Sequence, residues 1–221
     1  MADHVDPFGE HRESLVTFGR RLATDDLAYG TSGNLSVRAG DLIAITPSGV
    51  PYQEMSPAGI CLVRLADGEP AAGRRPSTET PMHLAVYRAT RAQAVVHTHS
   101  PFVVALSSVL DELPAIHYAM ASLGGPVRVA PYARFGTDGL AGNALAALAG
   151  RSAVILRNHG ALTYGSTLGQ AYERALVLEW LARVYWHAQL AGTPRTLDAA
   201  ALAEVAEATR ALRYGEPDPL P

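Results

Sequence analysis

The chain has 221 residues, of which 48% are hydrophobic and 18% charged, and its formal net charge is -3 at pH 7. These ordinary globular values predict one domain with a large core and give no electrostatic case for nucleic acid or a membrane surface, so we expect a small-molecule ligand. No apolar run approaches the roughly 18 residues of a membrane span, and the polar opening lacks signal-peptide features, so we expect a cytoplasmic protein.

The first half of the sequence predicts a helix, several short strands and a second helix. Apolar residues recur at roughly helical spacing over residues 10–29, which predicts an opening amphipathic helix. Residues such as Thr80 and Pro81 are typical of a helix start, with threonine as the cap and proline in the first turn, and this helix should continue to about residue 91. Short β-rich runs separated by Gly, Pro and Asn predict strands over 34–38, 42–46 and 60–68.

The second half predicts alternating strands and helices, ending in the longest helix of the chain. Strands are expected over 94–100, near 127–130 and over 152–165, with a turn at His159-Gly160, and helices over 101–110, 140–150, 168–192 and 200–212. In the helix over 168–192, apolar residues recur every fourth position and predict one continuous stripe, made of Leu176, Trp180, Val184 and Ala188.

Two features of residue usage narrow the chemistry. All 18 basic residues are arginine, and the sequence contains no lysine. Schiff-base catalysis and covalent pyridoxal phosphate both require a lysine amine, so a ketone or aldehyde substrate must be polarised by a metal or by hydrogen bonds. Cys61 is the single cysteine; it allows no intrachain disulfide, and its apolar neighbours indicate a core residue.

The strongest chemical signal is the pair His97 and His99, two residues apart in a predicted buried strand. Side chains at i and i+2 share one face of a strand, so both imidazoles can reach one ion, and a shared cation offsets their desolvation. His159, far downstream, is a candidate third ligand, because three imidazoles with an open fourth position are how proteins hold catalytic zinc. The remaining histidines are assigned no chemistry: His4, His11, His83, His117 and His187.

Several polar turns add candidate contacts. Glu79 can serve as a fourth metal ligand or as a base, or simply occupy a helix start that favours a carboxylate. The segments 31–34, 46–49 and 77–80 bring hydroxyls and glycine-exposed backbone N–H groups that suit a phosphate, although each alone is also typical of an ordinary turn.

Seven ordered motifs together resemble the class II aldolase and epimerase (adducin-like) family, closest to its fuculose-phosphate aldolases: GTSGNLSVR, ITPSGVPY, RPSTETPMH, VVHTHSPF, AIHYAM, APYARFGT and LRNHGAL. The match covers about residues 10–190, leaving a C-terminal helix and tail over 191–221. The resemblance implies a single α/β domain, a three-layer α/β/α sandwich around a mainly antiparallel sheet. It also implies a homotetramer with active sites between subunits.

The resemblance also implies roles for individual residues. Metal ligands would be His97, His99 and His159; the acid/base would be Glu79, which can ligate the metal without substrate; and Tyr118 would cross from the adjacent subunit to handle the aldehyde-side proton. Phosphate-binding positions would be Gly33, Asn34, Ser48, Gly49, Ser77 and Thr78. The aldehyde pocket would be lined by Phe135 and by Tyr214 of the tail.

The implied reaction is zinc-dependent, reversible aldol cleavage of a ketose 1-phosphate to dihydroxyacetone phosphate and a small aldehyde, with Co²⁺ or Mn²⁺ as alternative metals. The substrate is left open between L-fuculose 1-phosphate and a 5-deoxypentulose 1-phosphate, because the tail after Tyr214 lacks a basic residue that the resemblance leads us to expect. The alternatives are a sugar-phosphate epimerase, a methylthioribulose-1-phosphate dehydratase, a phospho-keto-acid decarboxylase and a non-catalytic adducin-like module. Glutamate rather than aspartate at Glu79 favours the aldolase over the epimerase, and the intact histidine set disfavours the adducin-like module.

Overall fold

The computed structural model describes residues 8–212, and its centre is one nine-stranded sheet with the order β4-β3-β2-β1-β5-β9-β8-β7-β6. Neighbouring strands pair antiparallel except β7 and β8, which are parallel. The strands are β1 (Asn34–Ala39), β2 (Leu42–Ile45), β3 (Cys61–Arg64), β4 (Pro70–Ala72), β5 (Ala94–Thr98), β6 (Glu112–Leu113), β7 (Val127–Ala130), β8 (Ala153–Leu156) and β9 (Gly160–Gly165).

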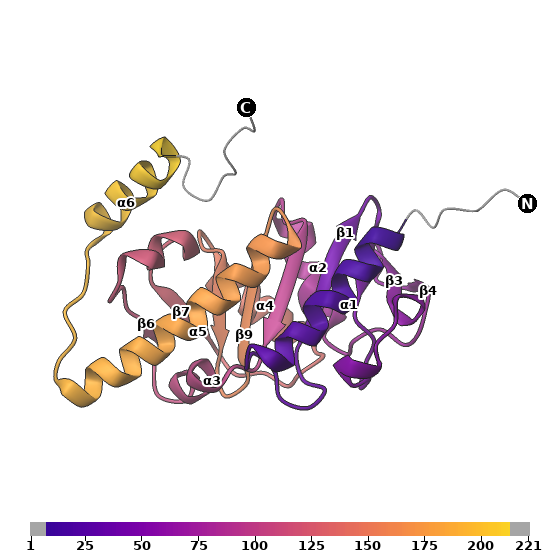
Figure 1. Ribbon diagram of the computed structural model, residues 1–221, viewed down its shortest axis with the longest axis horizontal. Helices are drawn as coiled ribbons and strands as arrows, with labels where there is room; N and C mark the ends of the chain where they lie inside the picture. Colours follow the sequence, from indigo (N-terminus) through magenta and orange to yellow (C-terminus); the bar gives the residue numbers. More distant parts are fainter. Residues whose placement is uncertain (1–7, 213–221) are drawn as a thin grey trace, which may run out of the picture.

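Helices cover both faces of this sheet, so the expected three-layer α/β/α sandwich is confirmed (Figure 1). The first face carries α1 (Gly9–Thr24), α3 (Pro101–Ser107) and α5 (Leu168–Ala191), and the second carries α2 (Thr80–Ala89) and α4 (Asp138–Leu148). The last helix, α6 (Ala199–Ala211), packs on the 3-10 segment η3 (Tyr118–Leu123) through buried Leu202. The short 3-10 turns η1 (Tyr52–Glu54) and η2 (Pro57–Gly59) complete the described elements.

Strand β5 lies at the centre and shows why the sheet is buried on both faces. Ala94 and Val96 pack under α1 and α5, whereas Val95 packs under α2. This alternation is the period-2 pattern expected of a strand, and it directs His97 toward the α2 face. The same alternation holds on the adjacent β1, where Leu35 faces α1 and α5, so that Asn34 and Ser36 face α2.

Two sequence-based expectations about helices need correction. The opening helix ends at Thr24, not at residue 29, because Asp26 adopts a left-handed backbone (φ 56) that breaks the helical path, and Leu27 reaches the core from the following loop. In α5 the every-fourth-residue stripe is not the packed face: Trp180 is exposed, and the buried positions advance by three and four residues, as in Tyr172, Ala175, Leu178 and Ala182. Residues spaced every four positions do not stay on one face, because a helix has 3.6 residues per turn.

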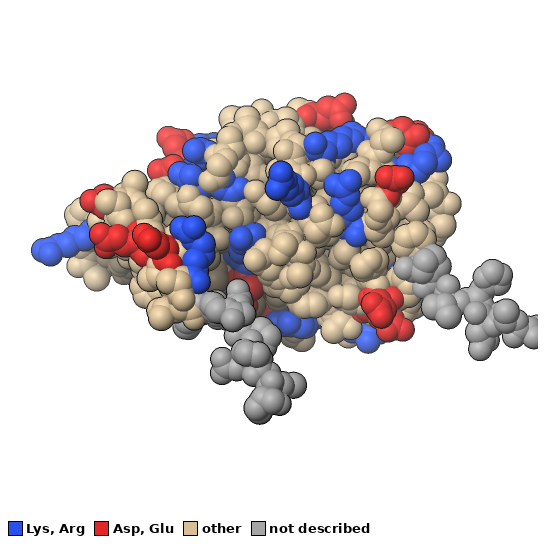
Figure 2. All heavy atoms as spheres, turned by 90° about the horizontal axis from the view of Figure 1, so that it is seen from above, with Lys and Arg blue, Asp and Glu red and all other residues tan. Residues whose placement is uncertain are grey.

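The distribution of charged side chains agrees with the small net charge of the sequence. Acidic and basic side chains are interspersed over the face seen in Figure 2, with no broad region of one sign. Over residues 8–212, no helix combines the length and apolarity needed to cross a membrane.

Candidate metal centre and cleft

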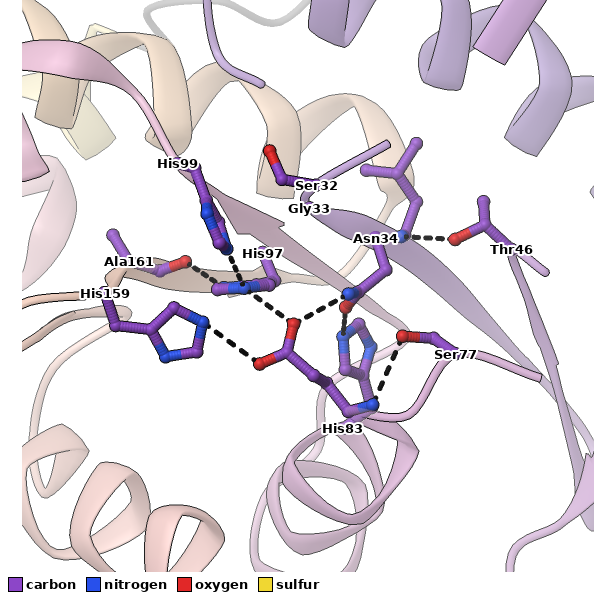
Figure 3. A network of polar contacts seen from close by, with 12 residues as sticks. Ser32, Gly33, Asn34, Thr46, Ser77, His83, His97, His99, His159 and Ala161 are labelled. Carbon is purple, nitrogen blue, oxygen red and sulfur yellow. Dashed lines mark hydrogen bonds and ion pairs between the residues drawn. The ribbon is translucent and has the colours of Figure 1, made fainter. Parts of the chain in front are cut away.

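Four side chains from distant parts of the chain converge at the end of β5. His97 lies on β5, His99 directly follows it, His159 comes from the turn between β8 and β9, and Glu79 precedes the first residue of α2. One potential ligand atom from each lies within 4.8 Å of all the others. The three imidazole rings point toward one another in Figure 3. The predicted trio therefore meets in space, although its members are separated by as many as 62 positions (159 minus 97).

Close backbone packing brings His159 to the histidine pair. A Cβ atom built on Gly160 would lie 2.1 Å from the Thr98 carbonyl oxygen, which no side chain tolerates, so glycine is required there. Asn158 takes a left-handed backbone (φ 53) that tightens the same turn. As a result, the segment carrying His159 lies directly against the segment carrying His99.

The backbone at the start of α2 presents Glu79 to the histidines. We expected Thr80 to cap this helix, but Thr80 is its first residue and its hydroxyl donates to the Ser77 carbonyl at 2.6 Å. Glu79 occupies the cap position without using its side chain as a cap. Its carboxylate is instead free to reach His97 at 2.9 Å and His159 at 3.2 Å.

Hydrogen bonding leaves a set of atoms suited to a cation. His97 Nδ1 lies 2.8 Å from the Ala161 carbonyl, which only accepts, so Nδ1 carries a hydrogen and Nε2 faces the cluster. That Nε2 is 2.9 Å from the Nε2 atom of His99, a distance that a proton or a shared cation must bridge. Glu79 Oε1 is buried; His159 Nε2 lies 3.2 Å away but is not aligned as a hydrogen-bond donor, so this oxygen has no hydrogen-bond partner among the described residues. Three imidazole nitrogens and one carboxylate oxygen are a donor set typical of a zinc site.

The pKa shifts of Glu79 and the histidines also favour a bound cation. Burial alone raises the pKa of Glu79, but His97 and His159 outweigh it and hold that pKa well below its usual range. Burial, reinforced by His97 and His159, lowers the pKa of His99 to about 3. His97 is fully buried, which lowers its pKa, yet the Glu79 carboxylate outweighs burial and the net direction is upward. An ionised carboxylate beside at least one neutral imidazole favours cation binding.

The cluster lies at the floor of a cleft of about 460 Å³. Of the cluster, Glu79, His99 and His159 line the cleft, whereas His97 is fully buried. The cleft is also lined by every predicted phosphate-binding residue: Gly33, Asn34, Ser48, Gly49, Ser77 and Thr78. No arginine is among the described residues that line the cleft. An anion bound here would therefore be held by hydroxyl and backbone N–H donors and by the start of α2, without a cationic side chain from the described part of this subunit.

Tyr52 anchors the polar turn over 31–34. Its buried hydroxyl lies 2.8 Å from both the Ser32 and the Gly33 carbonyl oxygens, and burial raises its pKa. Gly33 has a left-handed backbone (φ 74), and a Cβ atom there would lie 2.9 Å from the His97 carbonyl. The 31–34 turn is thus held against β5, next to the histidine cluster.

The predicted aldehyde-side residues are not gathered in the same way. Phe135 lines the cleft beside Tyr132, and both rings are more than half exposed. Tyr118 is 58% exposed and is not a cleft residue of its own subunit; its ring stacks near His117, which in turn contacts Trp180. Tyr214 lies outside the described residues. The roles predicted for these residues stay predictions.

Comparison with known proteins places this geometry in a family. Residues 13–186 match the model of the class II aldolase and adducin N-terminal domain. The chain belongs to that family. A class II aldolase, L-fuculose 1-phosphate aldolase, has a solved structure that superposes with a TM-score of 0.88 at 36% identity, covering 91% of this chain and 96% of the other.

Two further aldolases are similar to this protein over most of the chain. The 5-deoxy-D-ribulose 1-phosphate aldolase of Bacillus thuringiensis serovar kurstaki is 39% identical, covering 85% of this chain and 90% of its own length. The 5-methylthioribulose-1-phosphate/5-deoxyribulose-1-phosphate aldolase of Rhodospirillum rubrum is also 39% identical, over 95% of each chain.

Two buried residues near the site, His83 and Glu179, were missed by the sequence interpretation. His83 follows Glu79 by four positions, the spacing of one helix face, and is fully buried behind it. Glu179 accepts hydrogen bonds from the Phe102 and Val103 amides at 3.0 Å each, which fixes the start of α3 just after His99. A lone acid within the apolar part of the predicted 168–192 helix was a usable signal for Glu179.

Proposed function

We propose that this class II aldolase reversibly cleaves a ketose 1-phosphate to dihydroxyacetone phosphate and a small aldehyde, with a divalent metal bound by His97, His99 and His159. The convergence of three imidazoles and Glu79 at the floor of a cleft lined by anion-binding turns carries this proposal. A chain without lysine cannot form a Schiff base with the ketone, so the alternative aldolase chemistry is closed to it.

Zn²⁺ is the metal we propose, since an imidazole-rich site suits it, and Co²⁺ or Mn²⁺ are the alternatives to test. When bound, the metal supplies a Lewis acid that stabilises the negative charge left on the ketone half as the carbon–carbon bond breaks. The Ala161 carbonyl would hold His97 in the tautomer that presents Nε2.

The cleft residues would bind the phosphate and orient the sugar. We assign the phosphate to the amides and hydroxyls around Gly33, Ser48, Gly49, Ser77 and Thr78, all on the cleft wall. Asn34 can contribute only in part, because its amide is already bonded to Glu79 and His83 and keeps one free N–H. Binding energy gained at the phosphate fixes the reacting carbons against Glu79.

Two residues would move protons. Glu79 would give a proton to the carbon of the ketone half after cleavage and remove it again in synthesis, a role that its position beside the histidines supports. Tyr118 of a neighbouring subunit would take up the proton of the C4 hydroxyl as the aldehyde forms. Exposure of Tyr118 outside its own cleft supports a role across a subunit boundary, and we therefore propose a homotetramer with shared active sites.

We favour a 5-deoxypentulose 1-phosphate as the substrate over L-fuculose 1-phosphate. The relatives matched over 85% and 95% of this chain are named for 5-deoxyribulose 1-phosphate. The aromatic Phe135 and Tyr132 at the cleft suit acetaldehyde better than lactaldehyde, because an apolar wall disfavours the additional hydroxyl of lactaldehyde. Because sugar phosphates do not cross membranes unaided, we place the reaction in the cytoplasm.

The decisive experiment measures dihydroxyacetone phosphate released by the zinc-loaded protein from 5-deoxyribulose, L-fuculose and methylthioribulose 1-phosphates. We expect release with acetaldehyde from the first substrate, loss of activity on chelation, and recovery with added Zn²⁺. His99→Ala should lose metal and activity together, whereas His187→Ala, which changes an exposed histidine outside the cleft, should lose neither. Failure to release dihydroxyacetone phosphate from any ketose 1-phosphate overturns the proposal, and loss of water from methylthioribulose 1-phosphate instead would indicate a dehydratase.

A further inference from the structure

A line of buried polar side chains runs inward from Glu79, behind the cleft. Asn34 Nδ2 donates to Glu79 Oε2 at 3.0 Å, and Asn34 Oδ1 lies 2.6 Å from His83 Nε2 (Figure 3). His83 Nδ1 lies 2.7 Å from the Ser36 hydroxyl, which is 2.8 Å from the Tyr87 hydroxyl. Asn34, Ser36, His83 and Tyr87 are all at most 4% exposed. The line therefore has one end at the reaction cleft and the other in the core.

Two regular spacings build this line. On α2 and the residue before it, Glu79, His83 and Tyr87 recur every four positions and share one helix face. On β1, Asn34 and Ser36 are two apart and share the strand face that points to α2. The strand pair interleaves with the helix trio, so each side chain bonds to the next from the opposite element.

Donor and acceptor rules give the line a direction. An ionised carboxylate only accepts, so Asn34 must turn its NH₂ group toward Glu79 and its carbonyl oxygen toward His83. His83 Nε2 must then carry the hydrogen, which leaves Nδ1 as an acceptor for the Ser36 hydroxyl if the ring is neutral. Burial lowers the pKa of His83 to about 3, which agrees with a neutral ring. Every hydrogen bond from Ser36 onward thus donates toward Glu79.

The line also differs from the other contacts of Glu79. His97 and His159 contact the carboxylate through Nε2 atoms, which a bound metal would take for itself. Asn34 contacts the same carboxylate through an amide that holds no metal. If a metal occupied the two Nε2 atoms, the Asn34 amide would remain as a hydrogen-bond donor to the Glu79 side chain.

We propose that His83 is a positioning residue for the reaction: it locks the Asn34 carboxamide so that its NH₂ group holds Glu79 in the orientation needed for proton transfer. The inference rests on the proposed role of Glu79 as the acid/base. If the role of His83 were only structural, its replacement would lower the stability of the protein but would not lower kcat selectively at a nearly constant KM. The printed hydrogen bonds of the His83 side chain go to Ser36 and Asn34, not to the three candidate metal-binding histidines, and His83 does not line the cleft in the described structure.

A direct test is neutron diffraction from crystals of the zinc-loaded protein, which locates hydrogen atoms without any assay. We expect deuterium on Nε2 and none on Nδ1 of His83, and two deuterons on the Asn34 nitrogen that faces Glu79. Deuterium on Nδ1 alone, or a flipped Asn34, overturns the proposal. Because this readout needs no turnover, it is independent of whether the substrate assignment is right.

Kinetics of matched variants complete the test. We expect His83→Leu to lower kcat about 100-fold, the cost of a misplaced catalytic group, with zinc content unchanged and KM within about threefold. His83→Gln keeps an N–H that can reach Asn34 and should recover most of kcat. Tyr87→Phe removes only the far end of the line and should stay within about threefold, and Tyr172→Phe, which removes a tyrosine hydroxyl bonded to Asp25 elsewhere, should leave kcat unchanged.

The outcomes separate this inference from the proposed function. If wild-type protein releases no dihydroxyacetone phosphate, the proposed function fails, and neutron diffraction still decides the orientation of Asn34. The positioning role is wrong if the wild-type protein is active and the His83→Leu variant, folded and loaded with zinc, has the same kcat. Should His83→Leu not fold, neutron diffraction decides: an Nε2-bound deuteron on His83 with the Asn34 nitrogen facing Glu79 supports the role, and an Nδ1-bound deuteron alone or a flipped Asn34 overturns it.

Discussion

The two sides of the cleft are built in different ways. On the metal side, Glu79 and His97 are at most 6% exposed and are held by buried partners such as Asn34 and the Ala161 carbonyl. The residues proposed for the aldehyde side, Phe135 and Tyr118 of a neighbouring subunit, are 57% and 58% exposed and have no comparable set of buried hydrogen-bond partners among the described residues. The proposed metal-binding and proton-transfer residues are therefore preorganised within one chain, whereas the residues proposed to contact the aldehyde are exposed.

This difference has a physical basis. A reacting centre loses rate when its groups shift by about 1 Å, so it gains from rigid, buried support. An exposed rim tolerates substitution and can be completed by a neighbouring subunit or by the chain terminus without disturbing the core. If the comparison is right, changes on the metal side should affect every substrate, and changes on the aldehyde side should affect substrates selectively.

The largest effect is expected from Glu79→Gln. The amide keeps the size of the side chain but cannot exchange the proton, so kcat should fall about 1000-fold for every ketose 1-phosphate, within the range for a lost acid/base. Metal content measured by atomic emission should stay at one ion per subunit, because three imidazoles remain. An unchanged kcat would remove Glu79 from its assigned role.

Tyr118→Phe should lower kcat about 100-fold, again for all substrates, since it removes a proton carrier. Its position on the exposed face predicts more: mixing Tyr118→Phe subunits with Glu79→Gln subunits should restore part of the activity, because some interfaces would combine two intact residues. Activity assays after subunit exchange would show this recovery. Mixtures as inactive as the separate variants would mean that Tyr118 does not work across a subunit boundary.

Phe135→Ala should change selectivity rather than turnover. Loss of apolar contact at the aldehyde end should shift the ratio of kcat/KM between acetaldehyde and lactaldehyde in the synthesis direction about tenfold. The KM for dihydroxyacetone phosphate should not change. Leu190→Ala, which changes an exposed residue outside the cleft, is the control, and an equal loss for both aldehydes would contradict a rigid division between the two sides.

The smallest effect concerns stability in acid. Burial, aided by His97 and opposed by Glu79, lowers the pKa of His83 from 6.5 to about 3, so between these values the unfolded chain binds a proton that the folded chain does not. Stability of the metal-free protein should therefore fall as the pH drops through this window, by about 1.4 kcal/mol per pH unit from this residue. Urea unfolding at pH 7 and pH 5 should show a smaller loss for His83→Gln, and equal losses would argue against a buried neutral His83.

The sequence predicted the metal side better than its support. The i,i+2 spacing of His97 and His99 reports a shared strand face directly, and the family motifs named Glu79 and His159. No local pattern shows that His83 bonds to Asn34, because that contact joins elements 49 positions apart. The packed face of α5 was also missed, since its apolar residues form two stripes and only the sheet beneath decides between them.

The contact between Gly160 and the Thr98 carbonyl limits how this protein can change over time. A methyl group at that point would push the His159 turn away from its neighbours, although no ligand had been altered. A library of all single variants should thus tolerate only glycine at position 160. We therefore expect changes in sugar preference to arise at the exposed rim of the cleft, because the backbone at Gly160 leaves no space for a side chain.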